Sequence, residues 1–79
     1  MSLSKVFDVR EFRRFYKERS AQFFQENYDS PEQVAYLYGK RYQTALNWWT
    51  GTNAPSGDTA TLMAIRHGDA YTEFMRRGA

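Results

Sequence analysis

The sequence has no cysteine, one histidine and two prolines among its 79 residues. A chain without cysteine forms no disulfide bond and offers no thiolate to a metal ion, which fits a reducing compartment such as the cytosol. His67 stands alone, so the ligand set of a zinc centre is also missing. We therefore expect a cytoplasmic protein with no metal and no cofactor.

Long apolar runs and β-strand signals are scarce as well. No segment approaches the roughly 20 apolar residues that a membrane span requires, and the first residues lack the apolar core of a signal peptide. Apolar and polar residues do not alternate over any long stretch, and the hairpin dipeptides Asn-Gly and Asp-Gly do not occur. These absences argue against a membrane-spanning chain and predict an all-α fold.

Enzyme signatures are missing too. No glycine-rich phosphate loop follows a strand, because no strand is expected. His67 has no nucleophile at a recognisable spacing, and the carboxylates are scattered along the surfaces of the expected helices. We expect a non-enzymatic protein with no small-molecule substrate.

Aromatic residues, by contrast, make up 18% of the chain. A domain of this size buries only about 60% of the surface that its unfolded chain exposes, so its core has to be efficient. Each large ring can bury roughly 150–250 Å². The net charge of +2 and the pI near 9.1 suit a nucleic-acid partner without requiring one. The length predicts one domain over residues 1–79.

The first expected helix covers residues 9 to about 27. Asp8 and Glu11 have the spacing of a capping box. Phe7 and Phe12 flank it at the positions of a hydrophobic staple. A spacing of about 100° per residue places four apolar side chains on one face of this helix, namely Phe12, Phe15, Tyr16 and Phe23.

Basic residues are frequent in the same helix, where two carboxylates, Glu11 and Glu18, offset them. They form either a solvated face or a basic flank for DNA. Arg19 falls on the apolar face, so its side chain reaches out to solvent or the helix bends near Ser20. The basic residues are Arg10, Arg13, Arg14, Lys17 and Arg19.

Four shorter helices follow, each with start and stop signals. Ser30 precedes Pro31 and Gln33, which together mark the clearest helix start in the chain. We expect helices over 31–38, ending at Gly39; 42–50, ending at Gly51; from Ser56 or Asp58 to about 66, closed by Gly68; and 70–77, capped by Asp69 and closed by Gly78. The prediction is an all-α bundle of about five helices, with an extended N-terminal helix, a helix-turn-helix over about 30–51 and C-terminal helices over about 57–77.

The helix pair over residues 30–51 meets the demands of a helix-turn-helix, in which two helices cross steeply over a short turn. Ala35 is small where the second helix crosses the first, and Gly39 tolerates a positive φ in the turn. Ala45 and Trp48 are spaced i, i+3 on the inner face. The outer face then consists of residues able to form hydrogen bonds, namely Tyr42, Gln43, Thr44 and Asn47.

The spacing of small, glycine, tryptophan and proline residues resembles the core pattern of the Cro/phage-repressor (XRE-like) helix-turn-helix family. The pattern is Ala35, three residues, Gly39, eight residues, Trp48, two residues, Gly51, three residues, Pro55. The resemblance implies a transcriptional regulator, encoded by a bacterium or a phage, that acts as a repressor or an activator. It also implies a homodimer that reads the major groove of double-stranded DNA at a palindromic site.

The resemblance also implies the residues that contact DNA. Arg41, Tyr42, Gln43, Thr44 and Asn47 match the base-contacting positions, and their side chains can bond base edges or contact the thymine methyl group. The positions expected to meet phosphates, which orient a protein without reading sequence, are Lys40, Thr50 and Asn53.

The chain departs from the family pattern in three places. Lys40 and Arg41 stand where the family usually has an apolar residue and a small hydroxyl cap, so the helix at 42–50 lacks its usual N-cap. Pro31 stands where a glutamine often opens the preceding helix. The N-terminal helix is longer than the family needs, which indicates an added role.

Two other functions compete with DNA reading. The same fold can serve as a protein–protein interaction module, an adaptor or antitoxin-like partner, which Trp49 and the N-terminal helix favour. Trp49 can cover the fourth helix, form a dimer or partner surface, or lie near the DNA backbone. RNA binding by the aromatic surface is the second alternative and predicts stacking on Tyr36, Tyr38 or Trp49.

Overall fold

The computed structural model describes residues 8–77, and all regular structure in this part of the chain is helical. The five helices are α1 (Val9–Asn27), α2 (Pro31–Tyr38), α3 (Tyr42–Trp49), α4 (Gly57–His67) and α5 (Asp69–Arg77). The predicted all-α fold of about five helices is confirmed. The third helix ends at Trp49, one residue before the predicted end. The predicted roles of Phe7 and Gly78 concern residues outside the described range.

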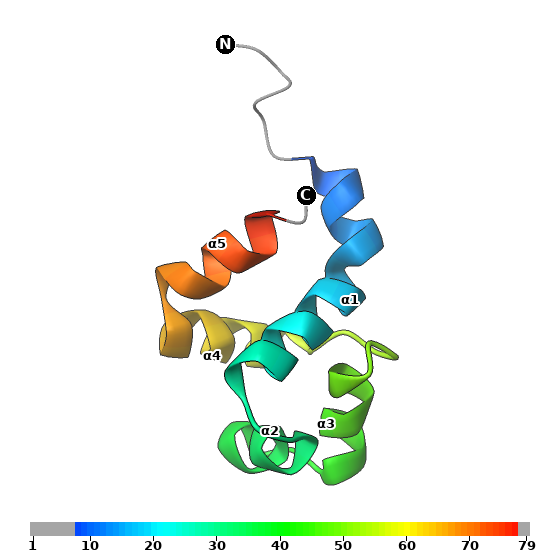
Figure 1. Ribbon diagram of the computed structural model, residues 1–79, viewed down its shortest axis with the longest axis vertical. Helices are drawn as coiled ribbons and strands as arrows, with labels where there is room; N and C mark the ends of the chain where they lie inside the picture. The colour runs from blue at the N-terminus through cyan, green and yellow to red at the C-terminus, as the bar shows by residue number, and fades with distance from the viewer. Residues whose placement is uncertain (1–7, 78–79) are drawn as a thin grey trace.

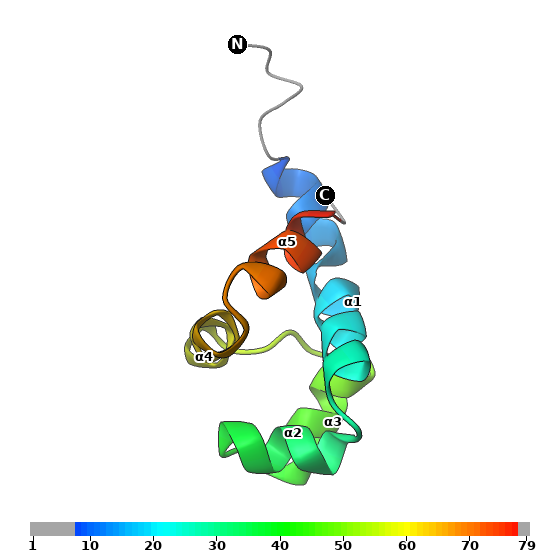
Figure 2. The ribbon, with the colours of Figure 1, turned by 60° about the vertical axis from the view of Figure 1, so that its left-hand side comes forward.

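The long helix α1 organises the fold, and the other helices pack along it (Figure 1). The helix α5 lies against the N-terminal half of α1, whereas α2 and α3 lie at its C-terminal end (Figures 1 and 2). The helix α4 connects the two groups and packs on α5. The α2–α3 pair is therefore held at one end of the molecule.

The caps of α1 and α2 follow from their sequences. Asp8 Oδ1 accepts hydrogen bonds from the backbone N–H groups of Arg10 and Glu11, at 3.0 and 3.2 Å. Ser30 Oγ accepts from the Gln33 N–H at 3.2 Å. Gln33 Oε1 accepts from the N–H of Asp29 at 2.6 Å, one residue before the donor of an ideal capping box.

Two glycines end α2 and α3 in the left-handed conformation that the sequence predicts. Gly39 has φ 64° and ψ 39°, and the following Lys40 N–H donates to Ala35 O at 3.0 Å. Gly51 has φ 80°, and a Cβ there would lie 3.7 Å from Ala21 Cβ and 3.8 Å from Lys17 O. Gly51 thus fixes the end of α3 against the middle of α1.

The starts of α4 and α5 differ in detail from the prediction. Ser56 is the N-cap of α4, but its hydroxyl donates to Asp58 Oδ1 at 2.6 Å instead of accepting from the backbone. Asp58 Oδ1 accepts the Thr59 N–H at 2.9 Å, so the carboxylate bonds the first turn. Asp69 was expected to precede the fifth helix as its cap, whereas it is the first residue of α5.

Phe24, which the predicted apolar face of the first helix omits, is at the centre of the core and is fully buried. Its ring stacks on Trp48 at 5.9 Å and 11°, and it meets Tyr38 edge-to-face at 6.1 Å. Phe15, which the sequence places on the same apolar face as Phe12, is half-buried and lies outside the core cluster. The buried apolar cluster consists of Phe23, Phe24, Val34, Tyr38, Ala45, Trp48, Met63, Phe74 and Met75.

The reason for this difference is that α1 has two packing faces. Phe12, Tyr16 and Phe23 face the C-terminal helices, and Phe23 meets Tyr71 and Phe74 at 5.3 Å each. Phe24 lies about 100° further round the helix and faces the α2–α3 pair. Helix α1 is continuous through Ser20, so it does not break there as one of the two predictions for Arg19 allowed. The guanidinium of Arg19 lies 5.5 Å from the centre of the Phe74 ring.

A hydrogen-bonded chain of three side chains joins α1, α2 and α4. Tyr28, just after α1, lies 2.6 Å from the Tyr38 hydroxyl and 2.5 Å from His67 Nε2. A neutral imidazole can accept at Nε2, so Tyr28 donates to His67 and accepts from Tyr38. Burial and then the neighbouring Arg66 lower the pKa of His67, whereas burial and Tyr28 raise the pKa of Tyr38.

This chain predicts that stability depends on pH. The pKa of His67 in the folded state lies below its ordinary value of 6.5, so its stabilising contribution is complete above that value. The contribution is lost as the pH falls toward the lower folded-state pKa, because the unfolded chain then binds the extra proton. We expect the urea midpoint to fall from pH 7.5 to pH 5. The variant His67→Gln, which keeps an acceptor, should lose that fall, and an equal fall in both proteins would assign it to other groups.

Candidate nucleic-acid interface

The outer face of α3 carries a polar pair. Gln43 Nε2 donates to Asn47 Oδ1 at 3.1 Å, and both residues were predicted to contact bases. Gln43 is exposed and Asn47 is half-exposed, so neither is part of the core. At the end of the helix, the Thr50 hydroxyl donates to Asn47 O at 3.4 Å and lies 2.8 Å from the Thr52 hydroxyl. The side chains of Gln43 and Asn47 retain unused donors and acceptors.

The inner face of α3 holds the helix in place. Ala45 is 0% and Trp48 is 3% exposed, as the sequence predicts for the face toward the core. Trp48 stacks on Phe24 of α1, so α3 has a rigid support behind its polar face. Ala35 is half-buried where α2 packs against α3, and Pro55 is buried in the segment that leads to α4.

The N-terminal end of α3 opens onto a pocket of about 630 Å³ with a mixed polar and apolar lining. It lies between the connection 39–41, the first turn of α3 and the segment 53–56. Four of the predicted DNA-contacting residues line it, namely Lys40, Arg41, Thr44 and Asn53. The residues predicted to contact bases therefore lie in two places. Arg41 and Thr44 border this pocket, whereas Gln43 and Asn47 pair on the outer face of α3.

The first turn of α3 leaves backbone donors free. Arg41 occupies the N-cap position, and its side chain forms no capping hydrogen bond, as the sequence predicts. The N–H groups at a helix start attract anions. Lys40 Nζ pairs with Asp58 Oδ2 at 3.6 Å, and Ser56, Thr59 and Lys40 together lower the pKa of Asp58.

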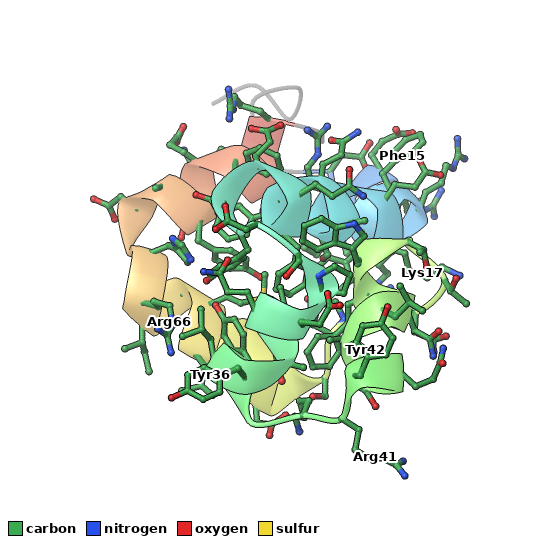
Figure 3. All side chains as sticks on the ribbon, turned by 60° about the horizontal axis from the view of Figure 1, so that its bottom comes forward. Phe15, Lys17, Tyr36, Arg41, Tyr42 and Arg66 are labelled. Carbon is green, nitrogen blue, oxygen red and sulfur yellow. The ribbon has the colours of Figure 1, made fainter. Side chains whose placement is uncertain are left out.

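Tyr42 and the residues after α3 complete the predicted set. Tyr42 is 47% exposed at the first position of α3, and Figure 3 shows it on α3, apart from Tyr36, which lies on α2. Arg41 extends away from the body in the same view. The Asn53 N–H donates to Asn47 O at 3.1 Å, so the backbone after α3 turns back onto its last turn.

The charges around α3 have one sign over a long segment. Residues 33–57 contain no aspartate or glutamate, and Lys40 and Arg41 are the charged residues in that segment. At the opposite end of α3, a Cβ on Gly51 would lie 3.8 Å from Lys17 O, so the chain there passes close to α1, and Figure 3 shows the Lys17 side chain beside this end. Cationic side chains therefore stand at both ends of the helix.

Trp49 and Tyr38 have structural surroundings. Trp49 is half-buried against the core, and Gln25 Nε2 of α1 donates to its backbone carbonyl at 2.7 Å. This contact places Trp49 beside α1, and α1 and α2 are the main packing partners of α3. Tyr38 is 5% exposed and hydrogen-bonded, so it cannot stack on an RNA base, whereas Tyr36 is 86% exposed.

The sequence left two roles open for the basic residues of α1, a solvated face or a basic flank for DNA, and did not place them relative to the helix at 42–50. Their relation to α3 depends on the contact between Gly51 and α1, which links residues far apart in the chain. Among residues 8–77, no three His, Asp or Glu side chains gather to hold a metal ion, and no helix is long and apolar enough to cross a membrane.

No protein-family model, curated protein or solved structure matches the chain. The likeness to the Cro/phage-repressor family therefore depends on the spacing of residues over 35–55 alone.

Proposed function

We propose that the protein is a sequence-specific, non-enzymatic regulator of transcription that binds double-stranded DNA through a helix-turn-helix made of α2 and α3. The observation that carries the proposal is the outward polar face of α3. Its Gln43–Asn47 pair is outside the core, while Ala45 and Trp48 fix the opposite face. A helix that displays amide side chains from a rigid support meets the main demand of base readout.

The chemistry of the exposed residues supports major-groove binding. Glutamine and asparagine can each bond N6 and N7 of adenine, and Arg41 can bond O6 and N7 of guanine. Residues 33–57 contain no carboxylate, and the nearby Asp58 is paired with Lys40 at 3.6 Å, which limits repulsion of the phosphates near α3. The helix has eight residues, a length of about 12 Å, which is close to the width of the groove, about 12 Å.

The pocket at the start of α3 supports a phosphate contact. Lys40, Arg41 and the free N–H groups of the first turn lie close together there. A backbone phosphate at this point would receive charge-assisted hydrogen bonds and would fix the register of α3 in the groove. Lys40 and Arg41 stand where the family usually has an apolar residue and a hydroxyl cap. On this proposal their cationic side chains bind the phosphate.

The decisive experiment is selection of bound sequences from random double-stranded DNA at fixed salt. We expect an enriched inverted repeat with half-sites about one turn apart, about 34–36 Å. The affinity for the selected site should fall steeply as salt increases. Selection without an enriched sequence would contradict the proposal and favour the protein–protein interaction module.

The proposal includes a homodimer, and α4 offers a surface for it. Leu62 and Ile65 are 44% and 74% exposed, and large exposed apolar groups mark contact surfaces. Asp58 lies near the start of α4 and Arg66 near its end. Both charges have partners within the protein, since Asp58 pairs with Lys40 at 3.6 Å and Arg66 donates to Leu37 O at 3.3 Å, so a two-fold contact between α4 helices depends on Leu62 and Ile65.

This surface predicts the effect of one substitution. Ile65→Glu introduces a charge into the apolar contact while leaving the core intact, so we expect sedimentation to change from dimer to monomer. The variant Thr72→Glu, on the exposed surface of α5, adds the same charge and should remain dimeric. A wild-type protein that sediments as a monomer, with or without the selected DNA, would contradict the dimer.

A second function remains supported by a specific observation. Tyr36 and Ile65 are 86% and 74% exposed, which also suits a protein–protein interaction module such as an adaptor. Such a module should show neither a steep salt dependence nor a sequence preference on DNA. The selection experiment above therefore separates the two functions.

A further inference from the structure

We infer that the N-terminal half of α1 is a second DNA-contacting element, which binds the phosphate backbone beside the groove that α3 reads. The inference rests on the proposed function, because it names double-stranded DNA as the partner. The element, called the α1 basic stripe, consists of Arg10, Arg13, Arg14 and Lys17. All four residues are exposed.

The charges of α1 are segregated around the helix. At about 100° per residue, the four cations fall within an arc of about 100°. Glu11 and Glu18 fall on the neighbouring side of the helix. The residues that pack on the C-terminal helices, such as Phe12 and Phe23, lie on the far side from the stripe. A solvated helix face often mixes both signs as i, i+4 pairs, whereas here Arg14 is the one stripe residue that pairs with a carboxylate of α1, Glu11, in the described part of the chain.

Three of the four stripe residues form no ion pair with any residue of the range 8–77. In the described part of the chain, Arg10, Arg13 and Lys17 form no ion pair, and Arg14 meets Glu11 at a long 3.8 Å. The remaining basic residues of α1 and α5 behave differently. Arg19 and Arg77 lie over the Phe74 ring at 5.5 and 5.2 Å. Within residues 8–77, three of the four cations of the stripe thus have no carboxylate partner.

The stripe is continuous with α3. Ala21 lies on the same arc of α1, and it contacts Gly51 directly after α3. Figure 3 shows Lys17 beside the C-terminal end of α3, with Arg41 at the opposite end. From Lys17 to Arg10 the stripe extends about 10 Å along α1.

Cations therefore bracket α3 at both ends. Lys40 and Arg41 precede its first residue, and Lys17 lies beside its end. The helix between them is about 12 Å long, close to the groove width of about 12 Å. Phosphates border the major groove on both sides, so one strand meets the connection 39–41 and the other meets the α1 basic stripe. The N-terminal half of α1, which makes this helix longer than the family needs, would then bind DNA phosphates.

The test compares two variants that lose the same charge. One is Arg13→Gln with Lys17→Gln in the stripe. The control is Arg76→Gln with Arg77→Gln, two exposed residues of α5. Each phosphate contact contributes about 0.9 to the slope of log K against log salt. For the stripe variant, we expect an affinity about 10-fold lower at physiological salt and a slope of log K against log salt that is smaller in magnitude by about 1.8. The selected DNA sequence should not change. The control should retain the wild-type slope within error.

Ethylation of single phosphates in the selected duplex gives the second readout. Ethylation of the phosphates that the stripe contacts should weaken DNA binding by the wild-type protein but not by the stripe variant. Ethylation of the phosphates near the connection 39–41 should weaken binding by both proteins. Loss of thermal stability alone would not produce this pattern. Equal losses in the stripe variant and the control, or an unchanged interference pattern, would overturn the inference while leaving the proposed function in place. A wild-type protein that binds no duplex would overturn both.

Discussion

Replacing Phe24 with alanine is expected to lower the free energy of unfolding by about 3–5 kcal/mol. The side chain is fully buried, and its ring meets those of Tyr28, Tyr38 and Trp48. A domain of this length has a total stability of only about 4–12 kcal/mol. The substitution therefore removes a large part of the stability that holds α2 and α3 on α1. Urea denaturation followed by tryptophan fluorescence measures the loss.

The matched control is Phe15→Ala, the same substitution on the same helix. Phe15 is half-exposed and outside the core cluster, and the Arg14 guanidinium lies 5.9 Å from its ring centre. We expect a smaller loss than at position 24, because Phe15 is only half-buried and contributes no ring to the core cluster. The milder Phe24→Leu keeps the protein folded and should fall between the two alanine variants. Equal losses at positions 15 and 24 would show that the ring cluster does not dominate the core.

The positions of the helices could be predicted because their signals are local. Ser30 followed by Pro31, and the glycines at 39 and 51, act within one turn of backbone, and the structure has caps or left-handed residues at these positions. The side of α1 on which a ring is buried is not local information. One periodic face accounts for Phe12, Tyr16 and Phe23, but α2 and α3 dock on another face, which buries Phe24 in place of Phe15.

In the candidate site, too, local spacing could be predicted from the sequence and tertiary packing could not. Gln43 and Asn47 are four residues apart, so their shared face follows from helix geometry. The pocket shared by Lys40, Arg41, Thr44 and Asn53 depends on how the segment after α3 folds back, which the spacing in the chain does not reveal. The place of Lys17 beside the end of α3 depends on tertiary packing in the same way.

On the proposed function, two groups of residues have different roles in DNA binding. Phosphate contacts supply affinity that falls with salt, and base contacts supply the choice of sequence. The cations at the two ends of α3 belong to the first group, whereas the amides of Gln43 and Asn47 belong to the second. Substitutions in the two groups should therefore change different observables, which makes the proposed function testable residue by residue.

Replacing Asn47 or Gln43 with alanine is expected to weaken binding to the selected DNA site by about 5- to 150-fold, since a good bidentate base contact contributes about 1–3 kcal/mol. Sequence preference should relax at one base position per half-site, while the salt slope stays near that of the wild type. Because the two side chains are hydrogen-bonded at 3.1 Å, the effects of the double substitution should not be additive.

Gln22→Ala is the control for this pair, since Gln22 is an exposed amide on α1. It should leave both affinity and sequence preference unchanged, because its side chain lies on neither the outer face of α3 nor the α1 basic stripe. Selection from random DNA, repeated with each variant at the same salt, measures the preference directly. If Asn47→Ala and Gln43→Ala select the wild-type site with wild-type affinity, α3 does not read the bases, and Tyr36 with α4 becomes the surface to examine for a protein partner.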